Sequence, residues 1–394
     1  MFEEVKNGFR ETYQCEPEFI FSAPGRTELS GNHTDHQHGV VLAAAVNRKC
    51  VAAVRKNGLN RVRVLSKGYH SFEVDLNDLE PNEMEFGRPS SLVRGVASKY
   101  IKDGESLSGI DVYIISEVLS GSGLSSSAAF EVLFGTIFNE LYCGGKYSKE
   151  DIARIGQYAE NEFFGKPCGL MDQMASSVGN IIFIDFNRPE EAIVKPIPFH
   201  FEECGYSLCI IDSGASHEDL TDEYAAITQE LKKVCKVFHK EFLREVKEEE
   251  FYAYIKEVRE AAGDRATLRA IHIFNENKRV LEQAKALEEN NFTRFLELVK
   301  ASGISSWHYL QNVVPTGATN HQDVALALAL CEKALHGKGA CRVHGGGFAG
   351  TIQAFVPSED VDAFVKEMED VLGEGKCHVM QINPDGGKLE ETLQ

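Results

Sequence analysis

The sequence has no excess of basic side chains and no long hydrophobic run. Its 41 lysines and arginines face 60 aspartates and glutamates, which gives a net charge of −19 at pH 7. An acidic chain repels the phosphate backbone, so we expect no nucleic-acid partner. The longest apolar run, VVLAAAV at residues 40–46, is far shorter than the roughly 20 residues that a membrane helix needs. We therefore expect no membrane partner either.

The ten cysteines lie at irregular spacings and form no CxxC pair. This distribution argues against a disulfide framework and against a zinc site built from cysteine pairs. The first ten residues, MFEEVKNGFR, are acidic and lack the apolar segment of a signal peptide. We expect a cytoplasmic protein with reduced thiols that acts as a monomer or a weak oligomer.

A chain of 394 residues is long for one hydrophobic core, which suggests two domains. We expect an α+β protein divided near residue 195 into residues 1–195 and 196–394. In the first part, the apolar pattern predicts strands at 49–56, 61–66, 110–116 and 179–186, and helices at 128–142 and 149–164. In the second part, it predicts a strand at 207–214, helical structure over 224–289, a glycine-rich turn and a strand within 341–356, a helix at 360–372 and a last strand at 376–383.

A glycine- and serine-rich stretch, LSGSGLSSSAAFE at residues 119–131, lies between a predicted strand and a predicted helix. Glycine permits a close backbone approach, and the N–H groups of the first helical turn attract an anion. The stretch lacks the Lys-Ser/Thr pair of a Walker A loop and the third glycine of a dinucleotide-binding fingerprint. It is therefore either an anion-binding loop of another kind or a plain turn with a serine cap.

A second stretch, GNHTDHQHG at residues 31–39, brings three histidines and an aspartate together. His33, His36 and His38 would need a distant fourth ligand to hold zinc, and no cysteine cluster supplies one. A sugar-binding loop is the other interpretation. Each oxygen of the Asp35 carboxylate can accept a hydrogen bond from one of two neighbouring hydroxyls.

Five ordered motifs resemble those of the GHMP small-molecule kinases and, among these, the galactokinases. They are APGRTELSGNHTDHQHG (23–39), GSGLSSSAA (121–129), AENEFFGKPCGLMDQMAS (159–176), DSGASHEDLTDEY (212–224) and CRVHGGGFAGT (341–351). The resemblance implies a two-domain GHMP kinase fold. Its N-terminal α/β domain would be ribosomal-S5-domain-2-like and its C-terminal domain ferredoxin-like, with the active site in the cleft between them.

The resemblance also implies ATP-dependent phosphorylation of the anomeric (C1) hydroxyl of galactose, with Mg²⁺ as cofactor. Asp172 would take or orient the proton of that hydroxyl, and Arg26 would neutralise phosphoryl charge and keep Asp172 ionised. Ser127 and Glu160 would ligate Mg²⁺. The nucleotide phosphates would lie against Gly121, Ser122, Gly123, Leu124, Ser125, Ser126 and Ser127, and against Gly345, Gly346 and Gly347.

In the galactokinases, the loop equivalent to residues 31–39 lines the sugar. Asp35 would accept hydrogen bonds from two ring hydroxyls, and His33 would contact the hydroxymethyl end. Gly169 would let a backbone N–H approach the sugar, and Tyr224 would close the pocket. His36 and His38 are at least as well suited to packing within the loop, so they are not assigned to the site.

Two residues depart from the typical galactokinase loop. Asn32 stands where those enzymes have a glutamate that accepts from the sugar 6-hydroxyl, and His36 replaces a tyrosine. An asparagine amide can also donate, which suits a C6 carboxylate, and the DHQ sequence resembles plant galacturonokinases. Galactose is the favoured substrate, with Asn32 near C6. Galacturonate or another galacto-configured sugar is the alternative.

Two further hypotheses come from other classes. A sugar- and ATP-binding sensor without catalysis is one, but the intact serine loop and Asp172 argue against it. A mevalonate- or homoserine-type kinase is the other, and the sugar loop at residues 31–39 argues against that.

Overall fold

The structure is a computed structural model of the chain, and it describes residues 1–118, 123–166, 168–215 and 220–393. Within this part of the chain, no helix is both long and apolar enough to cross a membrane.

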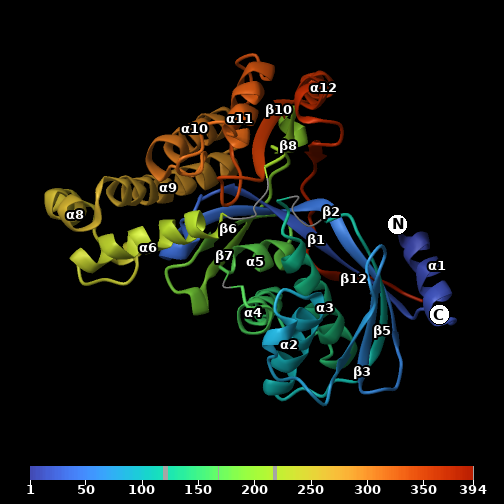
Figure 1. Cartoon of the computed structure of the whole chain (residues 1–394). Helices are drawn as coiled ribbons and strands as arrows, with labels where there is room; N and C mark the ends of the chain where they lie inside the picture. Colours follow the sequence, from blue (N-terminus) through green and yellow to red (C-terminus); the bar gives the residue numbers. More distant parts are fainter. Residues whose placement is uncertain (119–122, 167, 216–219, 394) are drawn as a thin grey trace. The chain divides into compact units, whose positions relative to one another are not determined.

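The chain folds into two compact units (Figure 1). Unit 1 contains Met1–Thr27, Ala44–Asn180 and Ile382–Gln394, and unit 2 contains Glu28–Ala43 and Ile181–Gln381. These units differ from the predicted halves 1–195 and 196–394 in three respects, the first of which is that Glu28–Ala43 belongs to unit 2. In addition, the chain leaves unit 1 near residue 180, and it returns to unit 1 at residue 382, where its last strand pairs with its first.

Unit 1 is built on a mixed sheet. Its strands are β1 (Phe19–Ser30), β2 (Val40–Lys56), β3 (Arg61–Ser66), β4 (Phe72–Asp75), β5 (Ile110–Ser116) and β12 (Lys388–Thr392), in the order β12-β1-β2-β5-β3-β4. Strand β3 runs parallel to β5, whereas β12 is antiparallel to β1 and β5 is antiparallel to β2. The strands predicted at 49–56, 61–66 and 110–116 are confirmed.

Helices cover both faces of this sheet (Figure 1). They are α1 (Phe2–Tyr13), α2 (Pro89–Lys102), α3 (Ser126–Tyr142), α4 (Lys149–Ala159) and α5 (Met171–Val178). Val5 and Phe9 of α1 pack on Val51, Ala53 and Ile115 of one face, and α2 to α5 lie on the other. Helix α4 begins with a capping box and continues into a π-helical turn at Glu160–Phe164. The two predicted helices of this half are confirmed as α3 and α4.

Unit 2 contains an antiparallel hairpin and a four-stranded antiparallel sheet. The hairpin pairs β6 (Ile181–Asp185) with β7 (Ile193–Ile197), and the sheet contains β8 (Tyr206–Asp212), β9 (Ala340–Val343), β10 (Thr351–Pro357) and β11 (Cys377–Met380). The strand order is β11-β8-β10-β9. With helices between β8 and β9 and between β10 and β11, this is the predicted ferredoxin-like arrangement.

The helices of unit 2 fall into two sets. Helices α11 (Asp323–Ala334) and α12 (Val361–Leu372) share an apolar core with the four-stranded sheet. The predicted helical stretch 224–289 is divided into α6 (Thr221–Val237), α7 (Glu248–Ala253), α8 (Ile255–Ala262) and α9 (Asp264–Glu288), and α10 (Phe292–Ser305) follows. Residues such as Ile227, Leu231 and Val258 form the core of this set, and its charged faces are exposed.

The strand predicted at 376–383 is β11, but it is not the last strand of the chain. Strand β12 follows it with the sequence KLEET, which contains only one apolar residue. A strand whose side chains are mostly partly or fully exposed carries little hydrophobic alternation, and the sequence pattern missed it for that reason.

Candidate active site

Asp172 lies in the first turn of α5, and Arg26 lies on β1. The guanidinium grips the carboxylate with two parallel hydrogen bonds, from Nε to Oδ1 and from Nη2 to Oδ2, each 2.7 Å long. Its third nitrogen, Nη1, donates to the Gly123 carbonyl oxygen at 2.7 Å, and the Arg26 backbone N–H donates to the Leu124 carbonyl oxygen at 2.9 Å. One arginine therefore fixes both the predicted catalytic carboxylate and the described end of the predicted phosphate loop.

Opposing effects set the pKa of Asp172. Burial raises this pKa, but the charge and hydrogen bonds of Arg26 and the hydroxyl of Ser125 outweigh burial, so the pKa lies below its ordinary value. The Asp172 side chain is still 28% exposed. The site therefore presents a charged, oriented carboxylate with part of its surface open.

Ser125 precedes α3 in the left-handed backbone conformation, with a φ of 58°. Its side chain makes no capping hydrogen bond to the helix and instead donates to Asp172 Oδ2 at 2.7 Å. The plain serine-cap interpretation is therefore wrong for Ser125.

The predicted metal ligands also meet. Ser127 Oγ donates to Glu160 Oε1 at 3.0 Å, and Glu160 is 2% exposed on the π-helical turn. Gln173 Nε2 donates to Glu160 Oε2 at 2.8 Å and to Glu131 Oε2 at 2.9 Å. Burial, followed by the charge of Glu160, raises the pKa of Glu131 well above its ordinary value. Glu131 is thus a buried, hydrogen-bonded neighbour of the pair.

The donor set of Ser127 and Glu160 fits Mg²⁺, which prefers oxygen ligands. No group of three or more histidine, cysteine, aspartate or glutamate residues in the described chain could hold a metal ion by itself. A metal at this pair would therefore take its other ligands from phosphate oxygens and water, as Mg²⁺ usually does in phosphoryl-transfer sites.

The rest of the predicted phosphate loop is only partly described. Gly121 and Ser122 lie outside the described residues. Leu124 is buried, with 2% exposure, and Ser126 is the first residue of α3. Gly169 lies three residues before Asp172, in the segment that leads into α5.

In unit 2, three predicted sugar-binding residues contact the glycine-rich turn Gly345–Gly347. Asn32 Nδ2 donates to the carbonyl oxygen of the first glycine, Gly345, at 2.6 Å. His33 Nε2 lies 2.9 Å from the carbonyl oxygen of the second, Gly346. The Tyr224 hydroxyl donates to the carbonyl oxygen of the third, Gly347, at 2.9 Å. The residues predicted for the sugar and the glycines predicted for the nucleotide therefore form one hydrogen-bonded cluster.

His33 is a neutral imidazole that donates a hydrogen bond within this cluster. Burial, and then the charge of His36, lower the pKa of His33 to about 4, so its imidazole is uncharged at pH 7. Because Nε2 faces a carbonyl oxygen, Nε2 carries the hydrogen, and Nδ1 keeps its lone pair.

The Asn32 amide, predicted to contact the substrate, makes its hydrogen bonds to protein groups. The residue is fully buried, and Nδ2 donates to Glu28 Oε1 at 3.2 Å as well as to the glycine-rich turn. Its Oδ1 accepts from Ser306 Oγ at 3.3 Å and from Asn312 Nδ2 at 2.8 Å. Both donors and both lone pairs of the amide are used by protein groups, so none remains for a sugar.

The other polar residues of the loop have separate partners. The Asp35 side chain is 12% exposed, and its Oδ1 lies 3.7 Å from His36 Nε2. The His38 ring stacks on Phe242 with a centroid separation of 3.6 Å. His36 and His38 therefore make local packing contacts.

Sequence reasoning missed Glu131, Gln173 and Asn312. Glu131 follows Ser127 by four residues on α3, a spacing that places both on one helix face. Gln173 follows Asp172 directly, so the same helix turn carries both. Asn312 lies in no motif, and its sequence gives no signal of its position.

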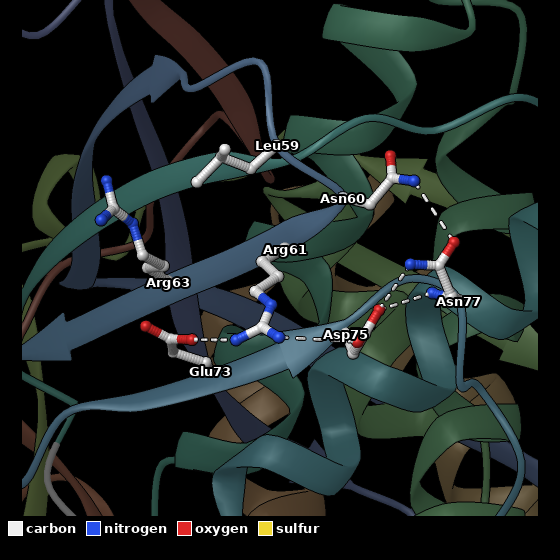
Figure 2. A pocket seen from close by; sticks show the side chains of 7 residues that line it. All are labelled: Leu59, Asn60, Arg61, Arg63, Glu73, Asp75 and Asn77. Carbon is white, nitrogen blue, oxygen red and sulfur yellow. Dashed lines mark hydrogen bonds and ion pairs between the residues drawn. The ribbon is translucent and has the colours of Figure 1, made fainter.

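One hollow in unit 1 and one hollow in unit 2 are lined by residues other than those of the candidate site. The hollow in unit 1 has a volume of about 430 Å³ and is lined by Leu59, Asn60, Arg61, Arg63, Glu73, Asp75 and Asn77 (Figure 2). Arg61 pairs with Glu73 at 3.2 Å, and Arg63 Nε donates to Asp111 Oδ1 at 2.7 Å. Both arginines that line this hollow are thus paired with carboxylates of the protein. The hollow in unit 2 has a volume of about 540 Å³ and contains Trp307.

Comparisons with known proteins identify the family of the chain. The GHMP kinases N terminal domain matches residues 91–180, and the galactokinase galactose-binding signature matches residues 7–56. A galactokinase of Actinobacillus pleuropneumoniae is 34% identical over 355 residues, which is 86% of this chain and 85% of that one. The chain belongs to the galactokinase family.

Other relatives of this galactokinase family member cover the chain as fully. A Streptomyces coelicolor galactokinase is 33% identical over 93% of this chain and 92% of that one. The crystal structure of Lactococcus lactis galactokinase complexed with galactose matches with a TM-score of 0.83 and 27% identity, and the match covers 100% of both chains. A mevalonate kinase matches with a TM-score of 0.65 at 16% identity over 93% of this chain and 99% of that one, which shows the shared GHMP kinase fold.

Proposed function

We propose that the protein transfers the γ-phosphoryl group of ATP to the C1 hydroxyl of galactose, giving galactose 1-phosphate and ADP. The observation that carries this proposal is the hydrogen-bonded group of Arg26, Ser125 and Asp172. It provides a charged, oriented carboxylate beside a guanidinium and a glycine-serine loop. Membership of the galactokinase family, and the galactose bound in the Lactococcus structure, support the choice of sugar.

Asp172 would accept the hydrogen bond of the C1 hydroxyl and orient its oxygen toward the phosphorus. Its lowered pKa makes it a weak base, so orientation and electrostatic stabilisation would contribute more than early removal of the proton. Arg26 would hold that carboxylate in place and keep positive charge beside the phosphoryl group.

Ser127 and Glu160 would hold Mg²⁺ through Oγ and Oε1. The 3.0 Å separation of these two oxygens supports binding of one cation by both. The cation neutralises charge on the phosphates when bound. The phosphates would lie against the loop Gly121–Ser127 and against the N–H groups of Gly345–Gly347.

In the sugar site, Asp35 would accept from two ring hydroxyls, and His33 Nδ1 would accept from the 6-hydroxyl. The Gly169 N–H would approach the ring, and Tyr224 would close the pocket. A neutral acceptor at His33 suits a hydroxyl and disfavours a carboxylate, which has no hydrogen to donate. Because the Asn32 amide has no donor left for a C6 carboxylate, galactose is favoured over galacturonate.

The test is ADP release with Mg·ATP and a panel of galactose, galacturonate, N-acetylgalactosamine, glucose and mevalonate. We expect turnover on galactose, with phosphorus NMR placing the phosphate on C1. Turnover on galacturonate without turnover on galactose would contradict the assignment at C6. Absence of turnover on every acceptor, with binding retained, would identify a sensor.

A further inference from the structure

Asn312 connects the sugar loop to the glycine-rich turn inside unit 2. The residue is fully buried and lies between the π-helical turn Ser306–Leu310 and α11. Its Nδ2 donates to Asn32 Oδ1 at 2.8 Å and to the Gly346 carbonyl oxygen at 3.1 Å. Both partners are acceptors, so the amide nitrogen must face them. One NH₂ group therefore bridges the two elements.

The turn also rests directly on the Asn312 backbone. The Phe348 N–H donates to the Asn312 carbonyl oxygen at 2.5 Å, and a methyl group added at Gly347 would lie 2.1 Å from that same oxygen. Gly347 has a φ of 79°, which a residue with a side chain rarely adopts. The turn therefore packs directly against the backbone of Asn312, and no space for a side chain remains between Gly347 and the Asn312 carbonyl oxygen.

The hydrogen bonds to the turn also determine the direction in which its peptide N–H groups point. The carbonyl oxygens of Gly345 and Gly346 are held by Asn32, His33 and Asn312. In a trans peptide, the N–H points opposite to the C=O, and the structure contains no cis peptide among its described residues. The N–H groups of Gly346 and Gly347 therefore point away from the sugar loop, which is the orientation needed to meet an anion from the other side.

We propose that Asn312 is a positioning residue that couples sugar binding to nucleotide binding. It holds the Gly345–Gly347 turn to Asn32 and thereby next to His33, so that ordering of the loop by a sugar also orders the N–H groups that face the phosphates. This inference rests on the proposed function, because it takes the loop as the sugar site and the turn as a phosphate site. Coupling of this kind is reciprocal, so each ligand strengthens the binding of the other by the same factor.

The experiment compares Asn312→Ala with the matched control Asn320→Ala, which changes an exposed asparagine eight residues further along. Calorimetry measures the Kd of galactose and of a non-hydrolysable ATP analogue with Mg²⁺, each alone and each with the other ligand saturating. We expect a several-fold mutual strengthening in the wild type and in Asn320→Ala. In Asn312→Ala, we expect that factor to fall close to one.

A second variant separates positioning from general loss of structure. Asn312→Ser keeps one donor and should retain part of the coupling, whereas a purely structural role predicts that coupling follows the melting temperature in every variant. An unchanged coupling factor in Asn312→Ala, or no coupling in the wild type, overturns the proposal.

Failure of the proposed function gives a different result. If the wild type binds the ATP analogue but not galactose, the sugar assignment fails, and Asn312 is judged on the analogue alone. A several-fold weaker analogue affinity in Asn312→Ala than in Asn320→Ala then supports its role at the turn. Equal affinities in the two variants overturn that role.

Discussion

Arg26 and Asp172 form a two-point ion pair in which Nε and Nη2 each donate to a different carboxylate oxygen at 2.7 Å. The pair fixes the carboxylate plane and leaves the pKa of Asp172 low despite burial. A carboxylate held in this way is a good orienting group and a poor proton acceptor. The pair therefore decides how the proposed reaction should respond to mutation and to pH.

Removal of Arg26 should make activity sensitive to mild acid. In the wild type, the pKa of Asp172 lies below 3.8, so this ion pair stabilises the fold at neutral pH and is lost only as the pH falls through that lower pKa. In Arg26→Gln, burial acts without the opposing charge, and the pKa of Asp172 should rise. The acid limb of kcat/KM should move to higher pH, with activity at pH 7 reduced about 10²- to 10³-fold. Arg259→Gln, which breaks an exposed pair with Asp264, is the control and should leave the limb in place.

Asp172→Asn should lower turnover strongly without preventing ATP binding. The amide cannot accept from both Arg26 and the substrate as a charged carboxylate does, and we expect kcat to fall about 10²- to 10⁴-fold. Turnover and binding of an ATP analogue are measured on the same preparation, with the exposed Asp362→Asn as control. Normal turnover in Asp172→Asn would exclude its proposed role.

Ser127→Ala should raise the Mg²⁺ concentration needed for half-maximal activity. The change removes one proposed oxygen ligand and the hydrogen bond to Glu160, so we expect a shift of about tenfold or more, since loss of even a group that only hydrogen-bonds to a metal ligand typically costs about 10- to 100-fold in metal affinity. The Mg²⁺ titration is compared with that of Ser106→Ala, a change at an exposed serine. Coincident titrations would remove Ser127 from the metal site.

Asn32→Glu should destabilise the protein instead of changing its preference at C6. The new carboxylate would be buried beside the Glu28 carboxylate, which already pairs with the buried Arg342, and would face a turn carbonyl oxygen. We expect the free energy of unfolding to fall by about 3 kcal/mol, measured by denaturant titration. The double variant Glu28→Gln with Asn32→Glu restores the number of carboxylates and should be more stable than additivity predicts. A stable Asn32→Glu with a new sugar preference would return Asn32 to the substrate site.

Galactose affinity should fall only as the pH approaches about 4. With the pKa of His33 lowered to about 4, the ring stays neutral and its Nδ1 stays an acceptor through mildly acidic pH. Protonation near pH 4 turns Nδ1 into a donor, so the Kd of galactose should rise as the pH approaches 4 and be level above about pH 5.5. His33→Gln should remove this dependence, whereas His38→Gln, at the ring stacked on Phe242, should keep it. A midpoint near pH 6.5 would exclude the neutral buried imidazole.

Local pattern predicted much of the fold, because the buried strands and helices repeat their apolar residues at clear periods. Strand β5 and helix α3 lie where the sequence indicated them. Strand β12 was missed because KLEET carries almost no apolar signal. The course of the chain between the two units was not predictable, since it follows from pairing between residues hundreds of positions apart, such as Phe19 with Thr392.

The candidate site shows the same limit. Motifs identified Arg26, Asp172, Ser127 and Glu160, and the structure places them in hydrogen-bonded pairs. They could not reveal that the Asn32 amide is fully used inside the protein, because that depends on a distant residue, Asn312. Saturation of a side chain by long-range partners is not encoded in its neighbours along the chain.

The return of the chain to unit 1 has a consequence during synthesis. Asn180 N–H donates to the Asn383 carbonyl oxygen, and Gly387 N–H donates to the Ser176 carbonyl oxygen on the helix that carries Asp172. Ser176 in turn donates to the Pro24 carbonyl oxygen, two residues before Arg26. The ribosome makes these supporting residues only after all of unit 2. A nascent chain can therefore contain both Arg26 and Asp172 long before it can hold their ion pair rigidly. Catalytic competence should appear late in synthesis, with the emergence of β12.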